Sequence, residues 1–395
     1  MDHSSFALLR WSTIRVIWLG LVIGLAACGK NNDPDLPQVL VSSTQLAELT
    51  KATIDGRLRD LPGSNLLTRH SVRVYRIVYR TRNTENVEVE ASGALLVPVV
   101  DNPKPLLSLQ HATITQENQA PSNFTDQSEA WTLGAAMSSI GFVVSAPDYL
   151  GFGASRSMPH PYEHAPTLAS ASLDMLRAVR EFCRKEGIVL NEKLFLAGYS
   201  LGGSATMALH KTIEEQAASE FTVTASAPGA GAYHKTGFAR SIMGSNQVLS
   251  FIDSYLWVLD TYNRVYKINR PVNQIIDARF SFTIQGNQLT GNFSRNPQEL
   301  FTPAFRQGIL SGSDTPFMNA LRDNDVHDWR PKAPIRMFHG SADDFVPIAN
   351  ARDALAAMRA RGATNVELQE IPGGNHFTSV PQYILGMYFY FAPLL

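Results

Sequence analysis

The sequence predicts an α/β protein whose mostly parallel central sheet is covered by helices on both faces. Three observations lead to this prediction. Short β-rich segments alternate with amphipathic helical segments through most of the chain, which is typical of parallel sheets. The 395 residues are 44% hydrophobic and 17% charged, which is enough apolar material for a large core. No period of about 20 to 50 residues repeats, so a solenoid or a propeller is excluded.

The N-terminal part of the sheet is expected to be antiparallel. Residues 71–79 and 87–97 are β-rich and flank the turn residues Asn83 and Thr84, so they should pair as neighbouring strands. Strands and helices then alternate. The further expected strands are residues 105–110, 141–146, 193–197, 221–227, 335–339 and 366–371. The expected helices are residues 126–140, 166–185, 201–213 and 348–361, with a last helix from about Val380.

One long segment interrupts this alternation. Residues 232–330 are rich in aromatic side chains and asparagine and show no strand–helix rhythm. We expect this segment to form an inserted cap over the edge of the sheet, so that residues 67–231 and 331–395 together make the core. The aromatic side chains either bind an apolar part of a substrate or form the cap's own core, and the sequence leaves both open.

Residues 1–27 are predicted to be a signal peptide. Arg10 and Arg15 precede an uncharged apolar run, residues 16–27, that is too short to span a bilayer comfortably. The run ends in small residues before Cys28 and resembles the lipobox of bacterial lipoproteins, which implies cleavage before Cys28 and a diacylglycerol on its thiol. The mature protein would then be anchored to a membrane without spanning it. An ordinary signal peptide with a chance cysteine is the alternative.

Residues 28–66 should then comprise the anchor, a polar tether and an N-terminal segment. The residue after Cys28 is Gly29 and not an aspartate, which at this position would retain a lipoprotein. By analogy, Gly29 fits sorting to the outer membrane or its periplasmic face. The second cysteine, Cys183, falls in a predicted helix and has no sensible partner. The fold should therefore be held without disulfides.

Charge and motifs exclude several classes of function. The formal net charge is −1, so no strongly basic face is expected to neutralise phosphates, and no nucleic-acid partner is expected. The sequence contains no HExxH, no paired Cys/His knots and no GxxxxGK phosphate loop. Neither a metal nor a cofactor is therefore expected.

The sharpest motif is Gly198-Tyr199-Ser200-Leu201-Gly202, which lies between a predicted strand and a predicted helix. A serine on such a turn is lifted out of the sheet, and the flanking glycines let the backbone turn without a Cβ clash. The hydroxyl then lies near the helix N-terminus, whose free N–H groups favour an oxyanion. Ser200 is therefore the candidate nucleophile.

A serine nucleophile needs a base, and the base needs an acid that orients it. In folds with this strand-to-helix turn, the chain order is serine, acid, histidine. His376 is the only histidine after Asp343 and follows the last predicted strand in a glycine-containing loop, so it is the candidate base. Asp343 and Asp344 follow the preceding strand and are the candidate acids. His339, at the end of that strand, is expected to be structural.

With these motifs in this order, the chain resembles the α/β-hydrolase superfamily over roughly residues 67 to 395. The inserted cap and the loop at Pro147-Asp148-Tyr149 are similar to the secretory triacylglycerol lipases related to yeast lipase A. This resemblance implies an α/β-hydrolase fold with a cap that shields an acyl pocket. It also implies an esterase or lipase that cleaves a small-molecule or lipid ester through an acyl-enzyme on Ser200. The disulfides of the secreted fungal members have no counterpart among the two cysteines of this chain.

The resemblance also selects individual site residues. In related enzymes the acid stands three residues before the valine of a Val-Pro pair, which here gives Asp343 in preference to Asp344. The oxyanion hole would be formed by the backbone N–H groups of Leu201 and Thr113. Ala112 stands where the family usually has glycine, so the amide of Ala112 stays open as the second donor.

Two residues near this loop are expected to support it. His111 should hold the loop without taking part in the reaction, and Asp148 should bond loop amides, with a role in the pocket as the alternative. Two other functions also stay open. A serine peptidase of the same fold would use the same three residues. A non-catalytic, lipid-anchored binding protein should lack a member of the triad, whereas all three are present.

Overall fold

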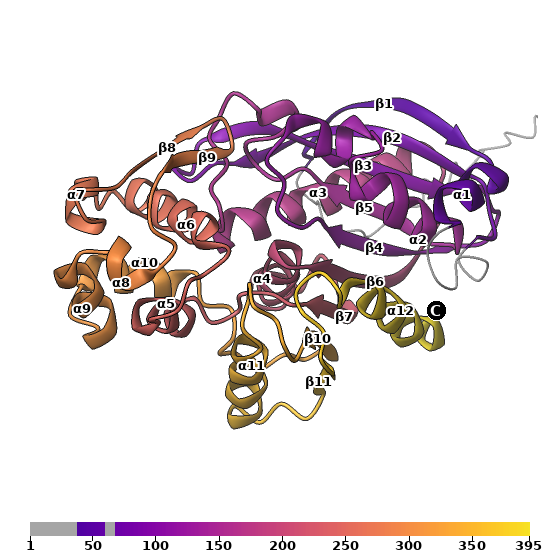
Figure 1. Cartoon of the computed structure of the whole chain (residues 1–395). Helices are drawn as coiled ribbons and strands as arrows, with labels where there is room; N and C mark the ends of the chain where they lie inside the picture. Colours follow the sequence, from indigo (N-terminus) through magenta and orange to yellow (C-terminus); the bar gives the residue numbers. More distant parts are fainter. Residues whose placement is uncertain (1–37, 60–67) are drawn as a thin grey trace, which may run out of the picture. The chain divides into compact units, whose positions relative to one another are not determined.

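The computed structural model describes residues 38–59 and 68–395 (Figure 1). The predicted signal peptide, Cys28 and most of the tether lie outside the described residues. The described chain contains a nine-stranded sheet with the strand order β1-β2-β3-β5-β4-β6-β7-β10-β11. The strands are β1 (Leu40–Leu49), β2 (Val72–Arg82), β3 (Glu88–Pro98), β4 (Lys104–Gln110), β5 (Val143–Pro147), β6 (Leu190–Tyr199), β7 (Val223–Gly229), β10 (Ile335–Gly340) and β11 (Val366–Ile371).

The predicted fold class is confirmed. Strands β5, β4, β6, β7, β10 and β11 run parallel to one another, and the pairings β1–β2, β2–β3 and β3–β5 are antiparallel. The parallel strands are buried almost throughout: all seven residues of β4 and all five of β5 are buried. A strand buried on both faces requires a helical layer on each side, which is the α/β-hydrolase arrangement.

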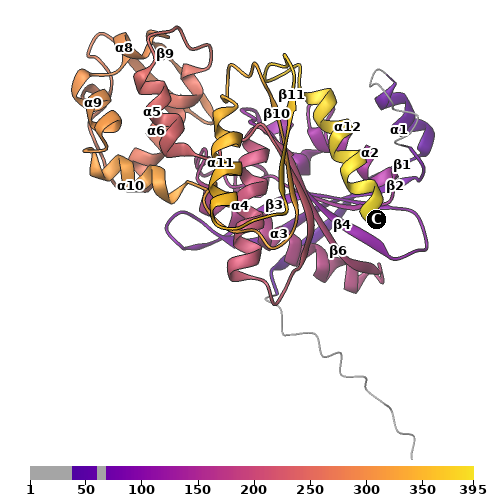
Figure 2. The ribbon, with the colours of Figure 1, turned by 90° about the horizontal axis from the view of Figure 1, so that it is seen from below.

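Helices cover both faces of the sheet (Figure 2). One face packs against α1 (Lys51–Leu58), α2 (Ala135–Ser139) and α12 (Val380–Phe391). The other face packs against α3 (Ala165–Lys185), α4 (Leu201–Gln216) and α11 (Ala349–Ala360). Within the described residues, no helix is long and apolar enough to cross a bilayer.

The N-terminal segment differs from the prediction. Residues 28–66 were expected to comprise an anchor, a tether and an N-terminal segment, and no strand or helix was expected there, whereas Leu40–Leu49 forms strand β1 and Lys51–Leu58 forms helix α1. Six consecutive residues of β1, from residue 41 to 46, are exposed. An edge strand that buries so little of its surface carries no hydrophobic alternation, so the sequence pattern did not reveal it.

Several element boundaries also shift, and the shift between residues 126 and 146 matters for the site. The helix expected at residues 126–140 begins at Ala130 with a π-helical turn (η4, Ala130–Gly134) and continues as α2. The strand expected from Gly141 begins at Val143, because Gly141 adopts φ +123° in the turn that follows the helix. Glu129 therefore lies immediately before the π-helical turn, and its side chain contacts a loop of the site described below.

The segment 232–330, which we expected to form a cap, has a hydrophobic core of its own. Its elements are α5 (Lys235–Gly244), α6 (Ile252–Val265), α7 (Val272–Ile275), β8 (Ser281–Gln285), β9 (Gln288–Asn292), α8 (Pro297–Leu300), α9 (Pro303–Ser311) and α10 (Thr315–Asp323). Strands β8 and β9 pair as an antiparallel hairpin separate from the main sheet. Several aromatics, among them Tyr262, Phe305 and Phe317, are buried in the cap's own core. Other aromatics of the cap line a cavity at the site.

Candidate active site

Ser200 lies on a tight turn between β6 and α4. Its backbone has φ 58° and ψ −120°, a region that residues with a side chain rarely adopt. The turn needs glycine on both sides. A Cβ on Gly198 would lie 2.5 Å from the carbonyl oxygen of Gly202, and one on Gly202 would lie 2.1 Å from that of Gln110. The strained turn is held because the Ser200 amide donates to the carbonyl of Gly229, 2.9 Å away on β7.

The structure brings the three predicted residues into one hydrogen-bonded chain. The Oγ of Ser200 is 2.9 Å from Nε2 of His376, and Nδ1 of His376 is 2.7 Å from Oδ2 of Asp343. All three side chains are buried, with 7%, 2% and 8% of the residue surface exposed for Ser200, His376 and Asp343. A serine hydroxyl, an imidazole and a carboxylate are therefore in contact and largely shielded from water.

The carboxylate of Asp343 is held by its own turn. Its Oδ1 accepts hydrogen bonds from the amides of Phe345 (2.9 Å) and Val346 (2.8 Å). Burial alone would raise the pKa of Asp343, but hydrogen bonds from His339 and His376 outweigh burial and lower the pKa to about 2. Asp343 is therefore ionised at neutral pH. The open alternative, Asp344, is exposed and is not the residue that contacts His376.

Two nearby residues hold the acid and base loops in place. His339 is fully buried, and its Nε2 donates to the carbonyl of Val346 at 2.7 Å, which fits the structural role expected for it. Asn375 accepts hydrogen bonds from the amides of Phe377 (3.0 Å) and Thr378 (2.9 Å). This turn fixes the loop that carries His376 before α12 begins.

The loop after β4 lines a cavity that also reaches Ser200. Thr113 lines a cavity together with Ser200, and its hydroxyl is 2.9 Å from the hydroxyl of Tyr162. The amide of Ala112 is already occupied, because it donates to Oε1 of Glu129 at 3.0 Å. Leu201 is the first residue of α4, so its N–H has no partner within the helix.

His111 and Asp148 support this loop through hydrogen bonds. The two ring nitrogens of His111 are 2.7 Å from the carbonyl of Ala112 and 3.2 Å from that of Asp148. The carboxylate of Asp148 accepts from the Ser92 hydroxyl (2.6 Å) and the Ser122 amide (2.7 Å), so it bonds a loop amide as expected. Sequence reasoning missed Glu129, because a single glutamate ahead of a helix carries no motif.

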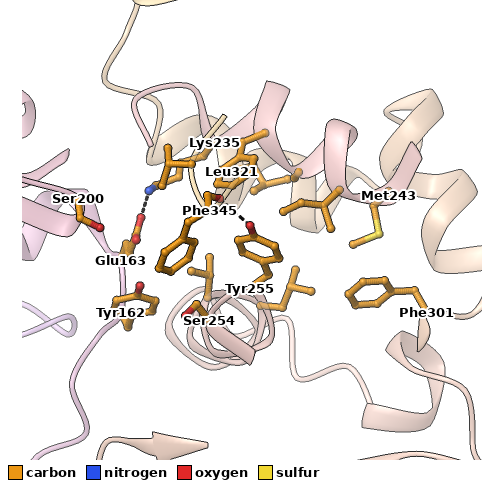
Figure 3. Close-up of a pocket in the computed structure, with 16 residues that line it drawn as sticks. Tyr162, Glu163, Ser200, Lys235, Met243, Ser254, Tyr255, Phe301, Leu321 and Phe345 are labelled. Carbon is orange, nitrogen blue, oxygen red and sulfur yellow. Dashed lines mark hydrogen bonds and ion pairs between the residues drawn. The ribbon is translucent and has the colours of Figure 1, made fainter. Parts of the chain in front are cut away.

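Two cavities meet at Ser200. The first extends from Ser200 into the cap (Figure 3). In Figure 3 the ion pair between Lys235 and Glu163 lies near the Ser200 end, and Met243 and Phe301 lie at the other end. Its remaining walls are mostly apolar: Phe238, Ala239, Ile242, Val258, Leu259, Leu321, Phe345 and Val346. Neither Glu163 nor Lys235 was singled out in the sequence.

The second cavity reaches Ser200 from the core side. It is lined by His376 as well as Ser200, whereas His376 does not line the first cavity. Its apolar walls are Leu109, Leu133, Phe377, Val380, Tyr383 and Ile384. The Gln110 side chain in this wall is satisfied internally, because it donates to Ser108 at 2.6 Å and accepts from Ser172 at 2.9 Å.

One group of side chains could hold a metal ion in the described part of the chain. It consists of His234, Asp325 and His327, whose potential ligand atoms lie within 4.8 Å of one another. None of these residues lines either cavity at Ser200.

Comparison with known proteins identifies the family. A model of the secretory lipase family matches residues 116–384, a range that includes Ser200, Asp343 and His376. The chain belongs to this family. It is a serine hydrolase that cleaves carboxylic esters, and the family description indicates an exported protein. The expectation of an esterase or lipase is therefore confirmed, in preference to a peptidase or a non-catalytic binding protein.

Solved structures agree with this assignment. The rice cell wall degrading esterase LipA from Xanthomonas oryzae shares 28% sequence identity with a TM-score of 0.79, over 89% of this chain and 97% of that one. Candida antarctica lipase A shares 17% identity with a TM-score of 0.63, over 88% of this chain and 82% of that one, and shows likeness of fold. A comparison with curated protein sequences gave no match.

Proposed function

We propose that Ser200, His376 and Asp343 are the catalytic triad with which this secretory lipase hydrolyses carboxylic esters. The observation that carries this proposal is the unbroken hydrogen-bond chain from Ser200 Oγ through the imidazole to Asp343 Oδ2, at 2.9 and 2.7 Å. His376 takes the Ser200 proton as Oγ attacks the ester carbonyl. Asp343 fixes the tautomer that leaves Nε2 free and stabilises the imidazolium that forms.

The rest of the reaction follows from the same three groups. The imidazolium of His376 protonates the departing alcohol, which leaves an acyl group on Ser200 Oγ. Water then enters, His376 removes its proton, and the resulting hydroxide attacks the acyl carbonyl. Ser200 recovers its proton from His376 as the carboxylic acid leaves, so the enzyme returns to its starting state. Substitution of Ser200 tests this proposal, as argued in the Discussion.

We infer that the oxyanion donors are the amides of Leu201 and Thr113. The alternative donor, Ala112, has its N–H committed to Glu129 at 3.0 Å, and an N–H can donate strongly to only one acceptor. By the same contact, Glu129 fixes the loop that carries Thr113. Glu129 is thus a positioning residue, and burial raises the pKa of its carboxyl group.

Replacing Glu129 by Ala is expected to lower kcat by about 10- to 100-fold with little change in KM, because the Thr113 amide loses its fixed position relative to the transition-state oxyanion. Glu129→Gln is the matched control, since its amide oxygen can still accept from Ala112 N–H and should restore most of the rate. Steady-state kinetics on a nitrophenyl ester measure both parameters. Equal kcat in Glu129→Ala and the unmodified enzyme would contradict the positioning role.

We further propose which side of Ser200 holds each half of the ester. The leaving alcohol must receive its proton from His376, so it must lie on the side where His376 is accessible. Among the two cavities at Ser200, only the second is lined by His376. The alcohol is therefore assigned to the second cavity, and the acyl group to the cavity in the cap.

A larger side chain in one cavity is expected to change the enzyme's preference only for the half of the ester that binds in that cavity. Met243→Trp should lower kcat/KM for long acyl esters by at least about tenfold while sparing acetyl esters, because Met243 lies at the end of the cap cavity far from Ser200. Ile384→Trp should instead penalise bulky alcohols at a fixed acyl group. Rates on two ester series, one varying each half, measure this. Opposite assignments of the two effects would overturn the orientation.

We propose, in addition, that export ends with a diacylglycerol on Cys28. The support is the sequence alone: a charged start, a short apolar run and small residues before Cys28. Cys28→Ala should release the enzyme from the membrane fraction, and the unmodified chain should incorporate a labelled fatty acid. Equal membrane retention of the two proteins, without label, would refute the anchor.

A further inference from the structure

The chain passes between core and cap at two places that lie side by side. The outgoing passage is residues 233–236, and the returning passage is residues 325–327. The Val326 amide donates to the Tyr233 carbonyl at 2.9 Å, and the Thr236 amide donates to Oδ1 of Asp325 at 3.0 Å. Any group that ties these two passages together would fix the cap on the core.

Three side chains at this junction are of types that ligate metal ions and lie close together. Ligand atoms of His234, Asp325 and His327 all lie within 4.8 Å of one another. The rings of His234 and His327 are stacked, with centroids 3.9 Å apart and an angle of 25° between their planes. One ring nitrogen of His327 lacks a partner: its Nδ1 is buried and makes no hydrogen bond. A buried nitrogen without a partner costs free energy, and a bound cation would remove that cost.

The surrounding residues orient the set as second-sphere groups orient metal ligands. Nδ1 of His234 is 2.8 Å from Oδ2 of Asp353 on α11. A histidine that donates Nδ1–H to a carboxylate presents the lone pair of Nε2, which is the usual arrangement in carboxylate–histidine–metal sites. The carboxylate of Asp325 is fixed as well, because it accepts both the amide (3.0 Å) and the hydroxyl (2.7 Å) of Thr236.

A glycine makes room for the His234 ring. A Cβ on Gly237 would lie 2.5 Å from Nδ1 of His234 and 2.6 Å from its Cε1. The ring can therefore lie against the first turn of α5 only because residue 237 has no side chain. The ring position is thus built into the packing of the junction and is not an accident of a freely rotating surface histidine.

From this geometry we propose that His234, Asp325 and His327 form a binding site for one divalent transition-metal ion, with Zn²⁺ as the best-fitting ion. Two imidazoles and one carboxylate are ligands that zinc prefers, whereas calcium and magnesium take oxygen ligands. The ligands come from both passages, so the ion would join the start and the end of the cap. Ser200, Asp343 and His376 are not part of the site, so its main effect should be on stability.

The neighbouring chain links this site to the substrate cavity. Lys235 follows His234 directly, and its ammonium group pairs with Glu163 in the wall of the cap cavity. Fixing His234 therefore also limits the movement of Lys235. The ion is accordingly a structural clamp at the base of the cavity wall, with no role in the hydrolytic steps.

Isothermal titration of the purified, chelator-treated enzyme with ZnCl₂ tests the proposal, using a purification tag without histidine. We expect one Zn²⁺ per chain with a Kd below about 10 μM, and a higher Tm in its presence, since an ion that binds only the folded state stabilises it. CaCl₂ should give neither signal. His327→Ala should remove this binding event, and Asp353→Asn should weaken it by about 10- to 100-fold. His70→Ala, which alters a histidine outside the site, should bind as the unmodified enzyme does.

Loss of metal binding can be distinguished from failure to fold and from loss of hydrolysis. Asp353 is half-exposed, so its substitution keeps the test valid if His327→Ala fails to fold. The proposal is overturned if the unmodified enzyme binds no Zn²⁺ at 100 μM, or if Asp353→Asn and His327→Ala bind with unchanged affinity and stoichiometry. Hydrolysis of acetyl esters reports separately on the triad. Lost hydrolysis with intact Zn²⁺ binding would concern the proposed catalytic residues and not the metal site.

Discussion

Replacing Ser200 by Ala is expected to lower kcat/KM for a nitrophenyl ester by at least about three orders of magnitude. In the proposed mechanism this hydroxyl attacks the carbonyl, and it lies 2.9 Å from His376 Nε2. Without it, the oxyanion amides and the cavities can still bind the ester, so some residual catalysis over water should persist. Substrate binding should change little, because alanine removes one oxygen atom from the junction of the two cavities.

Ser204→Ala is the matched control for this substitution. Ser204 lies one turn further along α4, is buried, and its hydroxyl makes no hydrogen bond. Its loss should leave the rate within about twofold. Thermal unfolding of both variants checks that the fold is retained, and a fluorophosphonate should label the unmodified enzyme and Ser204→Ala only. Retention of activity within about tenfold in Ser200→Ala would remove Ser200 from the mechanism.

Much of this site could be predicted because its residues sit at the ends of strands. Ser200, Asp343 and His376 follow β6, β10 and β11, and the carboxyl ends of parallel strands meet at one edge of a sheet. The buried strands carry continuous apolar runs that are easy to recognise. The strand-to-helix turn at Ser200 and the positions of Asp343 and His376 after later strands could therefore be expected from local patterns, although these residues are up to 176 positions apart.

Features that depend on packing between distant segments could not be predicted. Glu129 bonds Ala112 through a contact between the π-helical turn and the loop after β4, and neither segment carries a motif for that contact. The ion pair of Lys235 with Glu163 joins the cap to the loop before α3. His234 and His327, which stack on each other, are 93 positions apart along the chain. Such pairs have no sequence spacing that a local pattern can detect.

Replacing Asp343 by Asn is expected to lower kcat by about three to four orders of magnitude, nearly as much as the loss of Ser200. The carboxylate accepts Nδ1–H of His376 at 2.7 Å, which leaves Nε2 free to take the Ser200 proton. An asparagine can donate its N–H to Nδ1 instead, and the proton then sits on Nε2, where it blocks base catalysis. The cavities and the oxyanion amides are untouched, so KM should change far less than kcat.

Asp344→Asn is the control that decides between the two candidate acids. Asp344 is exposed and adjacent in sequence, so its substitution changes the formal charge of the turn by the same amount. We expect Asp344→Asn to keep kcat within about threefold. Equal losses of kcat in the two variants would mean that the charge of the turn matters and not the contact with His376. A large loss of kcat in Asp344→Asn alone would mean that Asp344 is the acid that orients His376.

The carboxylate of Asp343 should also affect the stability of the fold at low pH. The pKa of Asp343 in the folded protein is about 2, below its usual value of 3.8. A carboxyl group with a lowered folded-state pKa stabilises the fold above the usual pKa, and this contribution is lost as the pH falls from about 4 towards 2. Asp343→Asn lacks the titrating group, so its free energy of unfolding should fall less steeply across this range than that of the unmodified enzyme. Urea unfolding at pH 5, 4 and 3 measures this difference, and parallel curves would show that the carboxylate of Asp343 is not held in its ionised form by His339 and His376.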